Sequence, residues 1–359
     1  MAIKDIIGNK KAIEMLLSFA KSKKAGTSYI INGEEGVGKT FAALQFAKAI
    51  NCLNQLEDGD CCNICENCRL LDKTLGQLDA DGFQQYPHPD VMYITTDKAQ
   101  ITIDLVRDSL IRLNAYKQIK LKYKILILKD AEKMNKEASN SVLKELEEPG
   151  DFSIIILIVN NIQKILPTIV SRCQRINIMR ADEKEIEKKL IQLGMDENLA
   201  KQAIMFCDGK IEKALNFKEI NNDILVAREI FLVLTSKTDN VEGIFEIIKS
   251  INEKMEESKT KKIKGGMENM TYQRLFLLDI LKMLAYIYKD FLLDKLGIKK
   301  IIASKYDIDI SNLKEMDFKV INTILKLISA AQMDLMANAN INLLLYNLLF
   351  NIRKVSLQQ

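Results

Sequence analysis

Tryptophan is absent from this 359-residue sequence, proline occurs four times, and histidine occurs once, at position 88. A single histidine excludes a metal centre built from several imidazoles, and no motif around His88 supports a Ser-His-Asp triad. The few prolines and 15 glycines exclude a collagen-like or low-complexity chain. Aromatic residues make up only 6% of a chain that is 48% hydrophobic and 28% charged, which favours helices with aliphatic cores.

Long apolar runs are also missing. No segment reaches the ~18 uninterrupted apolar residues that a membrane-spanning helix needs. The first residues carry charges within their apolar stretch and lack a small-residue cleavage site, so they do not resemble a signal peptide. We therefore expect a folded cytoplasmic protein with no membrane partner. The formal net charge of +4 neither proves nor excludes a nucleic-acid partner.

The length of the chain corresponds to about two to three domains. Short, continuously apolar runs followed by turn or helix signals occur only in the first half, and they predict a parallel sheet covered by helices on both faces. We expect this α/β domain to span residues 1–180. Its predicted strands are residues 28–32, 91–95, 124–129 and 154–159.

Helical periodicity replaces the strand pattern after Ile178. Asp182, with Glu185 as its capping-box partner, predicts a helix start, and Gly194 predicts the stop. We expect a small helical domain over residues 181–219 and an all-helical domain over residues 220–359. A polar stretch at residues 256–269 should interrupt the helices of that last domain. The fold class is thus α/β plus all-α.

The run GEEGVGKT at residues 33–40 fits the phosphate-binding pattern G-x-x-x-x-G-K-[ST], between a predicted strand and a predicted helix. The alternative is a glycine turn that only joins strand to helix, but a Lys-Thr pair after the last glycine has no packing purpose. Backbone N–H groups would cradle the phosphates, the lysine would reach the outer ones, and the threonine hydroxyl would bind Mg²⁺. We expect ATP or ADP with Mg²⁺ at Gly33, Gly36, Val37, Gly38, Lys39 and Thr40.

Five of the seven cysteines lie between positions 52 and 68, and clustered thiols in a reducing compartment favour a metal site over disulfides. The C-x2-C-x2-C spacing of the last three and one upstream thiol predict a structural zinc site, because four thiolates leave no open position for water. Cys61 is the alternative to its neighbour Cys62, which the spacing favours. The isolated Cys173 and Cys207 are expected to be buried small hydrophobes. The predicted ligands are Cys52, Cys62, Cys65 and Cys68.

A P-loop ATPase also needs a carboxylate at the end of a second strand to hold Mg²⁺. The predicted strand at 124–129 ends in Lys129, which puts a cation there, and the pleat should turn the next residue, Asp130, another way. Weak or absent hydrolysis follows. The alternative is that Asp130 swings into the site where the end of the strand frays. Asn160 can reach a γ-phosphate, and Arg172 can point out of the domain; in isolation, both are ordinary turn or surface residues.

Several motifs together resemble the bacterial clamp-loader subunits of the AAA+ class. They are the P-loop, the cysteine insertion after its helix, His88-Pro89-Asp90, NSVLKELEEP at 140–149 and Ser171-Arg172-Cys173. The resemblance covers the whole chain, and it implies a P-loop parallel-sheet domain with a zinc module, a helical lid and a helical collar. It implies a role in DNA replication beside other clamp-loader subunits (gamma/tau and delta), the sliding clamp and primed DNA.

Within that family, the sequence departs from the motor subunits, which are of the gamma/tau type. The family's Walker B aspartate falls on Lys129, its catalytic glutamate on Asp130 as a degenerate Walker B residue, and its sensor 2 arginine on Glu212. Asn160 keeps the sensor 1 position, and Arg172 keeps the arginine-finger position, which in this family reaches the ATP of the next subunit. These residues resemble the delta-prime type, whose own ATPase activity we expect to be weak or absent.

Two other functions compete with this interpretation. An ATP-hydrolysing motor subunit is favoured by the intact P-loop and opposed by Lys129 and Glu212. A stand-alone zinc-dependent DNA-binding protein is favoured by the cysteine spacing and by the basic run at 259–264. That function needs a basic recognition helix, which the sequence lacks, and the basic run is more simply a solvated loop.

Overall fold

The computed structural model describes ten ranges of the chain, which form two compact units, residues 1–215 and 216–359. Each unit is described by itself. The division into three domains stays a prediction, with residues 181–215 lying in the first unit. The described ranges are 1–22, 27–72, 83–84, 90–96, 100–115, 118–150, 152–236, 241–262, 269–297 and 316–357.

A six-stranded sheet in the order β2-β3-β4-β5-β1-β6 forms the centre of the first unit. All neighbouring strands are parallel except β2 and β3, which pair antiparallel. The parallel register aligns Asn32 with Val159 and Lys129 with Ile158, so the carboxyl ends of β1, β4 and β5 lie at one edge. The strands are β1 (Ser28–Asn32), β2 (Phe83–Gln84), β3 (Val91–Ile94), β4 (Lys124–Lys129), β5 (Ser153–Val159) and β6 (Cys173–Asn177).

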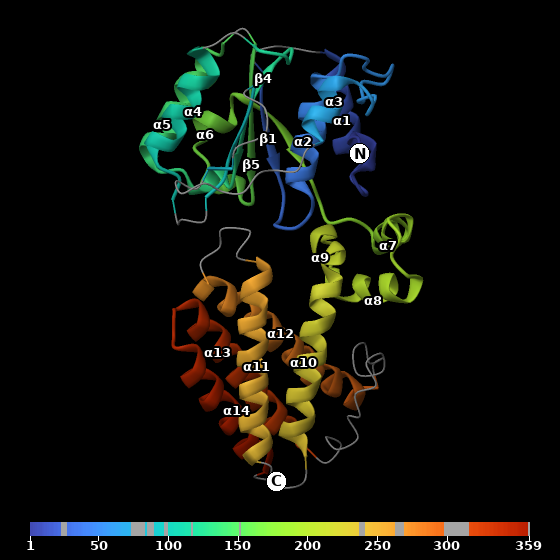
Figure 1. Cartoon of the computed structure of the whole chain (residues 1–359), viewed down its shortest axis with the longest axis vertical. Coiled ribbons are helices and arrows are strands. Elements are labelled where there is room, and N and C mark those ends of the chain that lie inside the picture. The colour runs from blue at the N-terminus through green and yellow to red at the C-terminus, as the bar shows by residue number, and fades with distance from the viewer. Residues whose placement is uncertain are drawn as a thin grey trace. The chain divides into compact units, whose positions relative to one another are not determined.

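Helices cover both faces of this sheet, as Figure 1 shows. Every residue of β5 is buried, and its side chains alternate between two apolar clusters. Ile156 and Ile158 pack in the cluster that includes α1 and α2, whereas Ile155 and Leu157 pack in the cluster that includes α4 and α5. The helices are α1 (Lys10–Ser22), α2 (Lys39–Ile50), α3 (Glu66–Leu71), α4 (Ile103–Ala115), α5 (Lys136–Glu147) and α6 (Pro167–Val170), with short 3-10 turns η1 (Ile3–Asp5), η2 (Ala131–Lys133) and η3 (Ile162–Lys164).

The fold class predicted from the sequence is confirmed, and β1 and β4 have the predicted bounds. The strand β5 begins one residue earlier than predicted, and β3 ends one residue earlier. The two strands at the sheet edges were not predicted. In β6 only Cys173 and Ile176 are buried, because an edge strand needs no continuous apolar run.

The last part of the first unit consists of α7 (Glu183–Gln192), α8 (Glu197–Cys207) and α9 (Ile211–Leu215). The Asp182 carboxylate caps α7 by accepting a hydrogen bond from the Lys184 N–H. Gly194 follows α7 at a φ of 87°, a left-handed conformation in which glycine is unstrained. The predicted start and stop of this helix are therefore confirmed.

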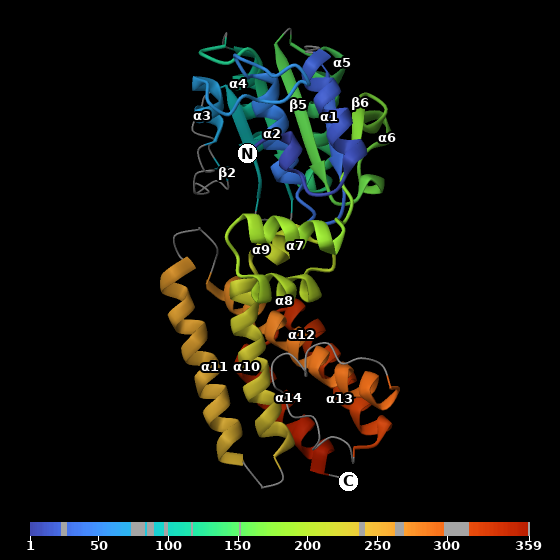
Figure 2. The same ribbon diagram turned by 90° about the vertical axis from the view of Figure 1, so that its right-hand side faces the viewer.

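All the secondary structure in the described residues of the second unit is helical, as predicted (Figure 2). Its buried Arg353 donates hydrogen bonds to the carbonyls of Leu234 and Ser236, which joins the last helix to the end of the first. The predicted interruption at 256–269 is wrong over residues 256–262, which remain helical, and residues 263–268 lie outside the described ranges. None of the described helices is both long and apolar enough to span a membrane. The helices are α10 (Phe217–Thr235), α11 (Val241–Lys262), α12 (Asn269–Lys295), α13 (Phe318–Met336) and α14 (Ile341–Leu357).

Candidate nucleotide site and metal centre

The loop between β1 and α2 requires its glycines. A Cβ atom at Gly33 would lie 2.1 Å from the Ile178 carbonyl oxygen, so no larger residue fits. Gly36 and Gly38 have φ angles of 83° and 97°, and Gly38 leads directly into α2. The loop thus presents the N-terminus of α2, where free N–H groups and the helix dipole favour an anion such as a phosphate. Val37 is buried and packs against Gly33.

Lys39 is 6% exposed and is held inside this loop. Its ammonium donates hydrogen bonds to the Glu34 carbonyl oxygen at 2.6 Å and to Asn160 Oδ1 at 2.9 Å. Burial lowers the pKa of the Lys39 ammonium, although the negative charges of Glu132 and Asp130 oppose the shift. The structure therefore brings together the lysine of the P-loop and the asparagine at the end of β5, which the sequence predicted separately.

Asn160 connects this lysine to two carboxylates. Its amide Nδ2 donates to Asp130 Oδ1 at 3.0 Å and to Glu132 Oε1 at 2.8 Å, and its backbone N–H donates to the same Glu132 oxygen at 3.0 Å. The other oxygen of Glu132, Oε2, is buried and has no hydrogen-bond partner among the described residues. Sequence reasoning missed Glu132 as a site residue, although its position two residues after Asp130 was a usable signal.

Asp130 lies beyond the end of β4, so the pleat of the strand does not set its direction. Its backbone is left-handed, with a φ of 52°, and this turn directs the carboxylate toward Asn160. The second carboxylate oxygen pairs with Lys133 Nζ at 3.3 Å. The expectation that Asp130 faces away from the site is therefore wrong.

Lys129 and Glu212 bring one positive and one negative charge close to the P-loop. Lys129 is half-buried at the end of β4, and its charge opposes protonation of Lys39. Glu212 is exposed at the start of α9, and its backbone N–H donates to the Gly36 carbonyl at 3.1 Å. Glu212 thus places an acidic side chain next to the loop.

Thr40, the second residue of α2, lies beside a buried tyrosine on β3. Burial raises the pKa of Tyr93 to about 12, and a hydrogen bond with Thr40 acts in the opposite direction. The glycine cradle, the free helix N-terminus and the lysine fit a nucleotide phosphate. The threonine hydroxyl and the two carboxylates are ligands of the kind that Mg²⁺ prefers, although a lysine lies among them.

Arg172 follows α6 on a different part of the first unit. Its side chain is 38% exposed. One guanidinium nitrogen pairs with Glu147 Oε1 at 2.9 Å, and another donates to the Thr168 carbonyl at 3.0 Å. These contacts hold Arg172 at the surface through exposed groups only.

Four thiols from the segment after α2 and from the first turn of α3 converge, and all their sulfur atoms lie within 4.8 Å of one another. Three of the sulfur pairs are 3.7 to 3.9 Å apart. A tetrahedral zinc ion with Zn–S bonds of about 2.3 Å would need sulfur atoms about 3.8 Å apart, so this donor set fits zinc. Backbone N–H groups at three of the four positions also donate to sulfur. The four residues are Cys52, Cys62, Cys65 and Cys68.

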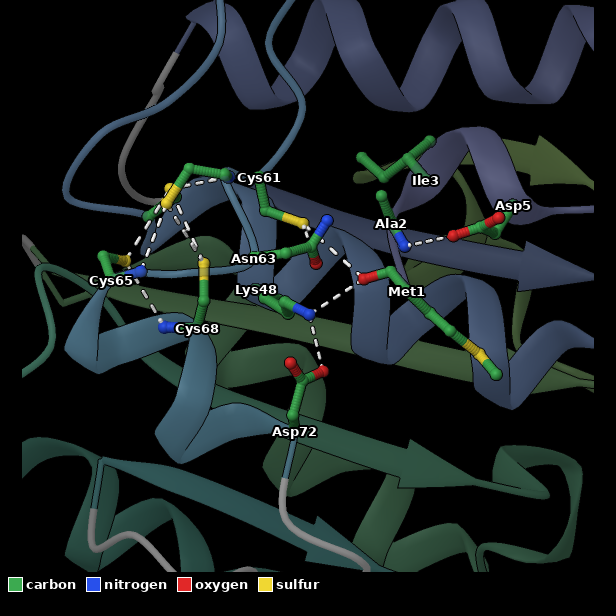
Figure 3. A network of polar contacts seen from close by, with 12 residues as sticks. Met1, Ala2, Ile3, Asp5, Lys48, Cys61, Asn63, Cys65, Cys68 and Asp72 are labelled. Carbon is green, nitrogen blue, oxygen red and sulfur yellow. Dashed lines mark hydrogen bonds and ion pairs between the residues drawn. The ribbon is translucent and has the colours of Figure 1, made fainter.

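The two neighbouring thiols of Cys61 and Cys62 have separate environments, and Figure 3 shows that of Cys61 beside Asn63 and Met1. Cys62 Sγ lies 3.9 Å from Cys68 Sγ, within the cluster. Cys61 Sγ instead donates to Asn63 Oδ1 at 3.4 Å and to the Met1 carbonyl at 3.8 Å. Burial raises the pKa of the Cys61 thiol to about 11. The structure thus places Cys62 in the cluster, the choice that the spacing favoured.

The segment that carries the clustered cysteines, residues 52–68 (the cysteine segment), is also joined to the start of the chain. The buried Lys48 of α2 donates to the Met1 carbonyl at 2.8 Å and to Asp72 Oδ1 at 2.5 Å (Figure 3). The buried carboxylate of Asp60 accepts the backbone N–H groups of Ile3 and Lys4 at 3.1 and 3.2 Å, and that of its neighbour Cys61 at 2.8 Å. These bonds join residues 1–5, α2 and the cysteine segment.

A comparison with protein families finds a match over the part of the chain that contains the P-loop and the cysteine cluster. Residues 8–182 match the family model described as "DNA polymerase III, delta subunit". The chain contains a DNA polymerase III delta subunit-like domain. His88 and Pro89 of the predicted family motif lie outside the described residues, whereas Asp90 lies within them.

Curated relatives extend this similarity. The chain is 30% identical to the delta-prime subunit of Bacillus subtilis DNA polymerase III over 197 residues, which are 53% of this chain and 54% of that protein. It is 28% identical to the tau/gamma subunit of Haemophilus influenzae over 199 residues, 54% of this chain and 26% of that protein. It is 28% identical to the Bacillus subtilis tau subunit over 260 residues, 70% of this chain and 43% of that protein.

The matches thus span 26% to 54% of the length of these relatives, and the chain is homologous to the tau, gamma and delta-prime subunits. Among solved structures, a DNA polymerase III gamma subunit-related protein from Thermotoga maritima is 17% identical with a TM-score of 0.48. That alignment covers 96% of this chain and 99% of the other.

Proposed function

We propose that this chain acts as a clamp-loader subunit of the delta-prime type in the cytoplasmic DNA polymerase III holoenzyme. It would work beside gamma/tau and delta subunits to open the sliding clamp and place it on primed DNA. Homology to the tau, gamma and delta-prime subunits supports the general role. The observation that carries the delta-prime type is the pair of misplaced charges at the P-loop, Lys129 and Glu212.

These charges oppose hydrolysis at the chain's own site. A cation at Lys129 stands where the Mg²⁺ shell needs an anion, and it disfavours the positive charge of Lys39. Glu212 puts a negative charge beside Gly36, where the transferred phosphate needs a cation. The glycine cradle and Lys39 remain suited to phosphate. We therefore expect ATP or ADP to bind here without efficient turnover.

Arg172 would act on the ATP of a neighbouring subunit as an arginine finger. A finger must leave its own domain surface to reach a phosphate, so its resting contacts must be exchangeable. The pairing of Arg172 with Glu147 meets this condition, because both side chains are more than a third exposed and such pairs contribute little to stability. Fingers in general accelerate phosphoryl transfer by on the order of 10³ to 10⁵.

The test uses the reconstituted complex of this chain with its cognate clamp-loader subunits. Arg172→Ala should lower the ATPase rate that clamp and primed DNA stimulate, and the loss should be partial because other sites stay intact. Arg175→Ala is the matched control, since Arg175 is exposed three residues further along. Stimulated rates and clamp loading equal to those of the unmodified complex would contradict the finger role.

The second candidate is an ATP-hydrolysing motor subunit of the gamma/tau type. The hydrogen-bonded group of Lys39, Asn160, Asp130 and Glu132 favours it, because two carboxylates lie beside the P-loop lysine. The turnover of the isolated chain, measured beside its nucleotide affinity, separates the two functions. Rapid turnover would support the motor and contradict the delta-prime type, whereas binding with little turnover would support our proposal.

The cysteine cluster would hold one structural zinc ion. Four thiolate ligands leave no open position for water, so zinc would supply folding free energy instead of chemistry.

The stand-alone DNA-binding function has less support. Residues 259–262 of its basic run end the helix α11, and residues 263 and 264 lie outside the described ranges.

A further inference from the structure

The phosphate loop carries its own acidic side chain between two cations. Both carboxylate oxygens of Glu34 accept hydrogen bonds from Arg180, from Nε at 3.0 Å and from Nη2 at 2.7 Å. Lys210 Nζ lies 3.2 Å from the Glu34 Oε2 atom. Arg180 Nη1 also pairs with Asp208 at 2.7 Å. Glu34 is therefore the acidic residue that both cations share.

Lys210 lies directly over the loop that would hold the phosphates. A Cβ atom at Gly36 would be 3.5 Å from the Lys210 Cβ atom, and the Glu212 N–H bond to the Gly36 carbonyl fixes this approach. The Lys210 side chain is only 19% exposed, because it lies along the surface of the loop. A cation thus stands two residues before the acid that replaces the lid arginine.

We infer that Lys210, assisted by Arg180, is a binding residue for the polyphosphate of a nucleotide. Glu34 forms ion pairs with both cations until the nucleotide displaces its carboxylate. The inference rests on the proposed binding of ATP or ADP at this P-loop. It assigns to Lys210 the cationic contact that Glu212 cannot make. Glu34 then acts as an internal competitor that weakens nucleotide binding.

The exposure of the pair makes this exchange inexpensive. The Glu34 side chain is 52% exposed and that of Arg180 is 44% exposed, so water can solvate both when they separate. The hydrogen bonds from Arg180 and then Lys210 hold the pKa of Glu34 below its usual value, which keeps the carboxylate charged. A polyphosphate carries more negative charge than one carboxylate and offers several acceptors for the same donors.

The experiment measures the affinity of the full chain for ADP and for ATP with Mg²⁺ by calorimetry. Glu34→Gln keeps the shape of the side chain and removes its charge, so it should tighten binding about threefold to tenfold. Lys210→Met should weaken binding by a similar factor. In the double variant, the gain from Glu34→Gln should fall below about twofold, because that gain requires a released Lys210.

Two controls separate a released lysine from a general change of charge. Glu35→Gln removes a neighbouring exposed acid of the same loop, and any gain from it should persist in the Lys210→Met background. Lys213→Met removes an exposed lysine of α9, the helix that begins directly after Lys210, and should leave affinity unchanged. Circular dichroism and thermal unfolding of each variant confirm that it is folded.

Additive effects of Glu34→Gln and Lys210→Met would overturn the inference, and so would an equal loss from Lys213→Met. Absence of nucleotide binding in both the unmodified chain and Glu34→Gln would overturn it as well. None of these results bears on Arg172, which acts on the nucleotide of a neighbour and is tested in the assembled complex. Loss of the Arg172 effect would in turn leave the affinities measured here unchanged.

Discussion

Asp90, directly before β3, gives a quantitative test of how the sheet is held at its amino-terminal side. Its carboxylate is buried and accepts backbone N–H groups from three successive residues, Ile119, Lys120 and Leu121, at 2.9 to 3.0 Å. Its carbonyl oxygen accepts the N–H of Ile125 in β4. The side chain therefore fixes the loop that precedes β4, and we assign Asp90 a structural role.

The expected cost of Asp90→Ala follows from the fate of each N–H group. Ile119 and Lys120 are exposed, so water can replace the carboxylate there at ~0.5–1.5 kcal/mol each. Leu121 is buried, and its orphaned N–H costs ~1–3 kcal/mol. Relief of a buried carboxylate offsets part of this sum, which leaves about 3 kcal/mol of lost unfolding free energy. Asp90→Asn keeps one acceptor oxygen and should cost about 1 kcal/mol.

Urea denaturation of the full chain, followed by circular dichroism, measures these changes in the transition of the first unit. Asp108→Asn is the control, because Asp108 is exposed on α4 and should change the free energy of unfolding by less than about 0.5 kcal/mol. A loss below about 1 kcal/mol for Asp90→Ala would refute the assignment. So would equal losses for the alanine and asparagine variants, since the argument depends on a retained acceptor.

Three further predictions concern the metal, the strand end and an ion pair. Metal analysis of the purified chain should find one equivalent of zinc, and Cys52→Ser should lower that content whereas Cys61→Ser should not; less than about half an equivalent in the unmodified chain would contradict the site. Lys129→Asp should make nucleotide binding more dependent on Mg²⁺ without creating robust hydrolysis, and titrations with and without Mg²⁺ measure this. Burial would raise the pKa of Asp5, but its bonds to Lys189 and the Ala2 N–H lower it below 3.8. The stabilisation from Asp5 is therefore present above pH 3.8 and lost as pH falls through the lower folded pKa, so Asp5→Asn should destabilise at pH 7 and have little effect near pH 2; equal losses at both pH values would refute this.

The sequence predicted the parts of the fold that rest on continuous burial or on backbone constraint. Residues 125–128 of β4 are all apolar because helices cover both faces of the sheet, and this run made the strand predictable. The P-loop is readable because only glycine fits beside the Ile178 carbonyl and in the left-handed turns at Gly36 and Gly38. Such requirements can be recognised from the type of a single residue at a single position.

Other features depend on contacts between distant residues, and no local pattern carries them. The strand β6 has too few buried residues to be recognised before its pairing with β1 is known. Glu132 joins the site only because the left-handed turn at Asp130 brings this segment against Asn160, which lies 28 residues further along. The ion pairs of Glu34 with Arg180 and Lys210 likewise arise from packing of the chain after the sheet against the P-loop.

The bonds that join the start of the chain to the cysteine segment have a consequence for cooperativity. The amides of Ile3 and Lys4 are held by the Asp60 carboxylate, which lies one residue before Cys61. Opening of the cysteine segment would free these amides. It would also break the contact of Cys61 with the Met1 carbonyl, which is the acceptor for Lys48. Residues 1–5, the start of the cysteine segment and the end of α2 should therefore open together as one local unfolding unit. Hydrogen exchange at Ile3 and Lys4 would then report the loss of a metal ion bound more than 40 residues away in the sequence.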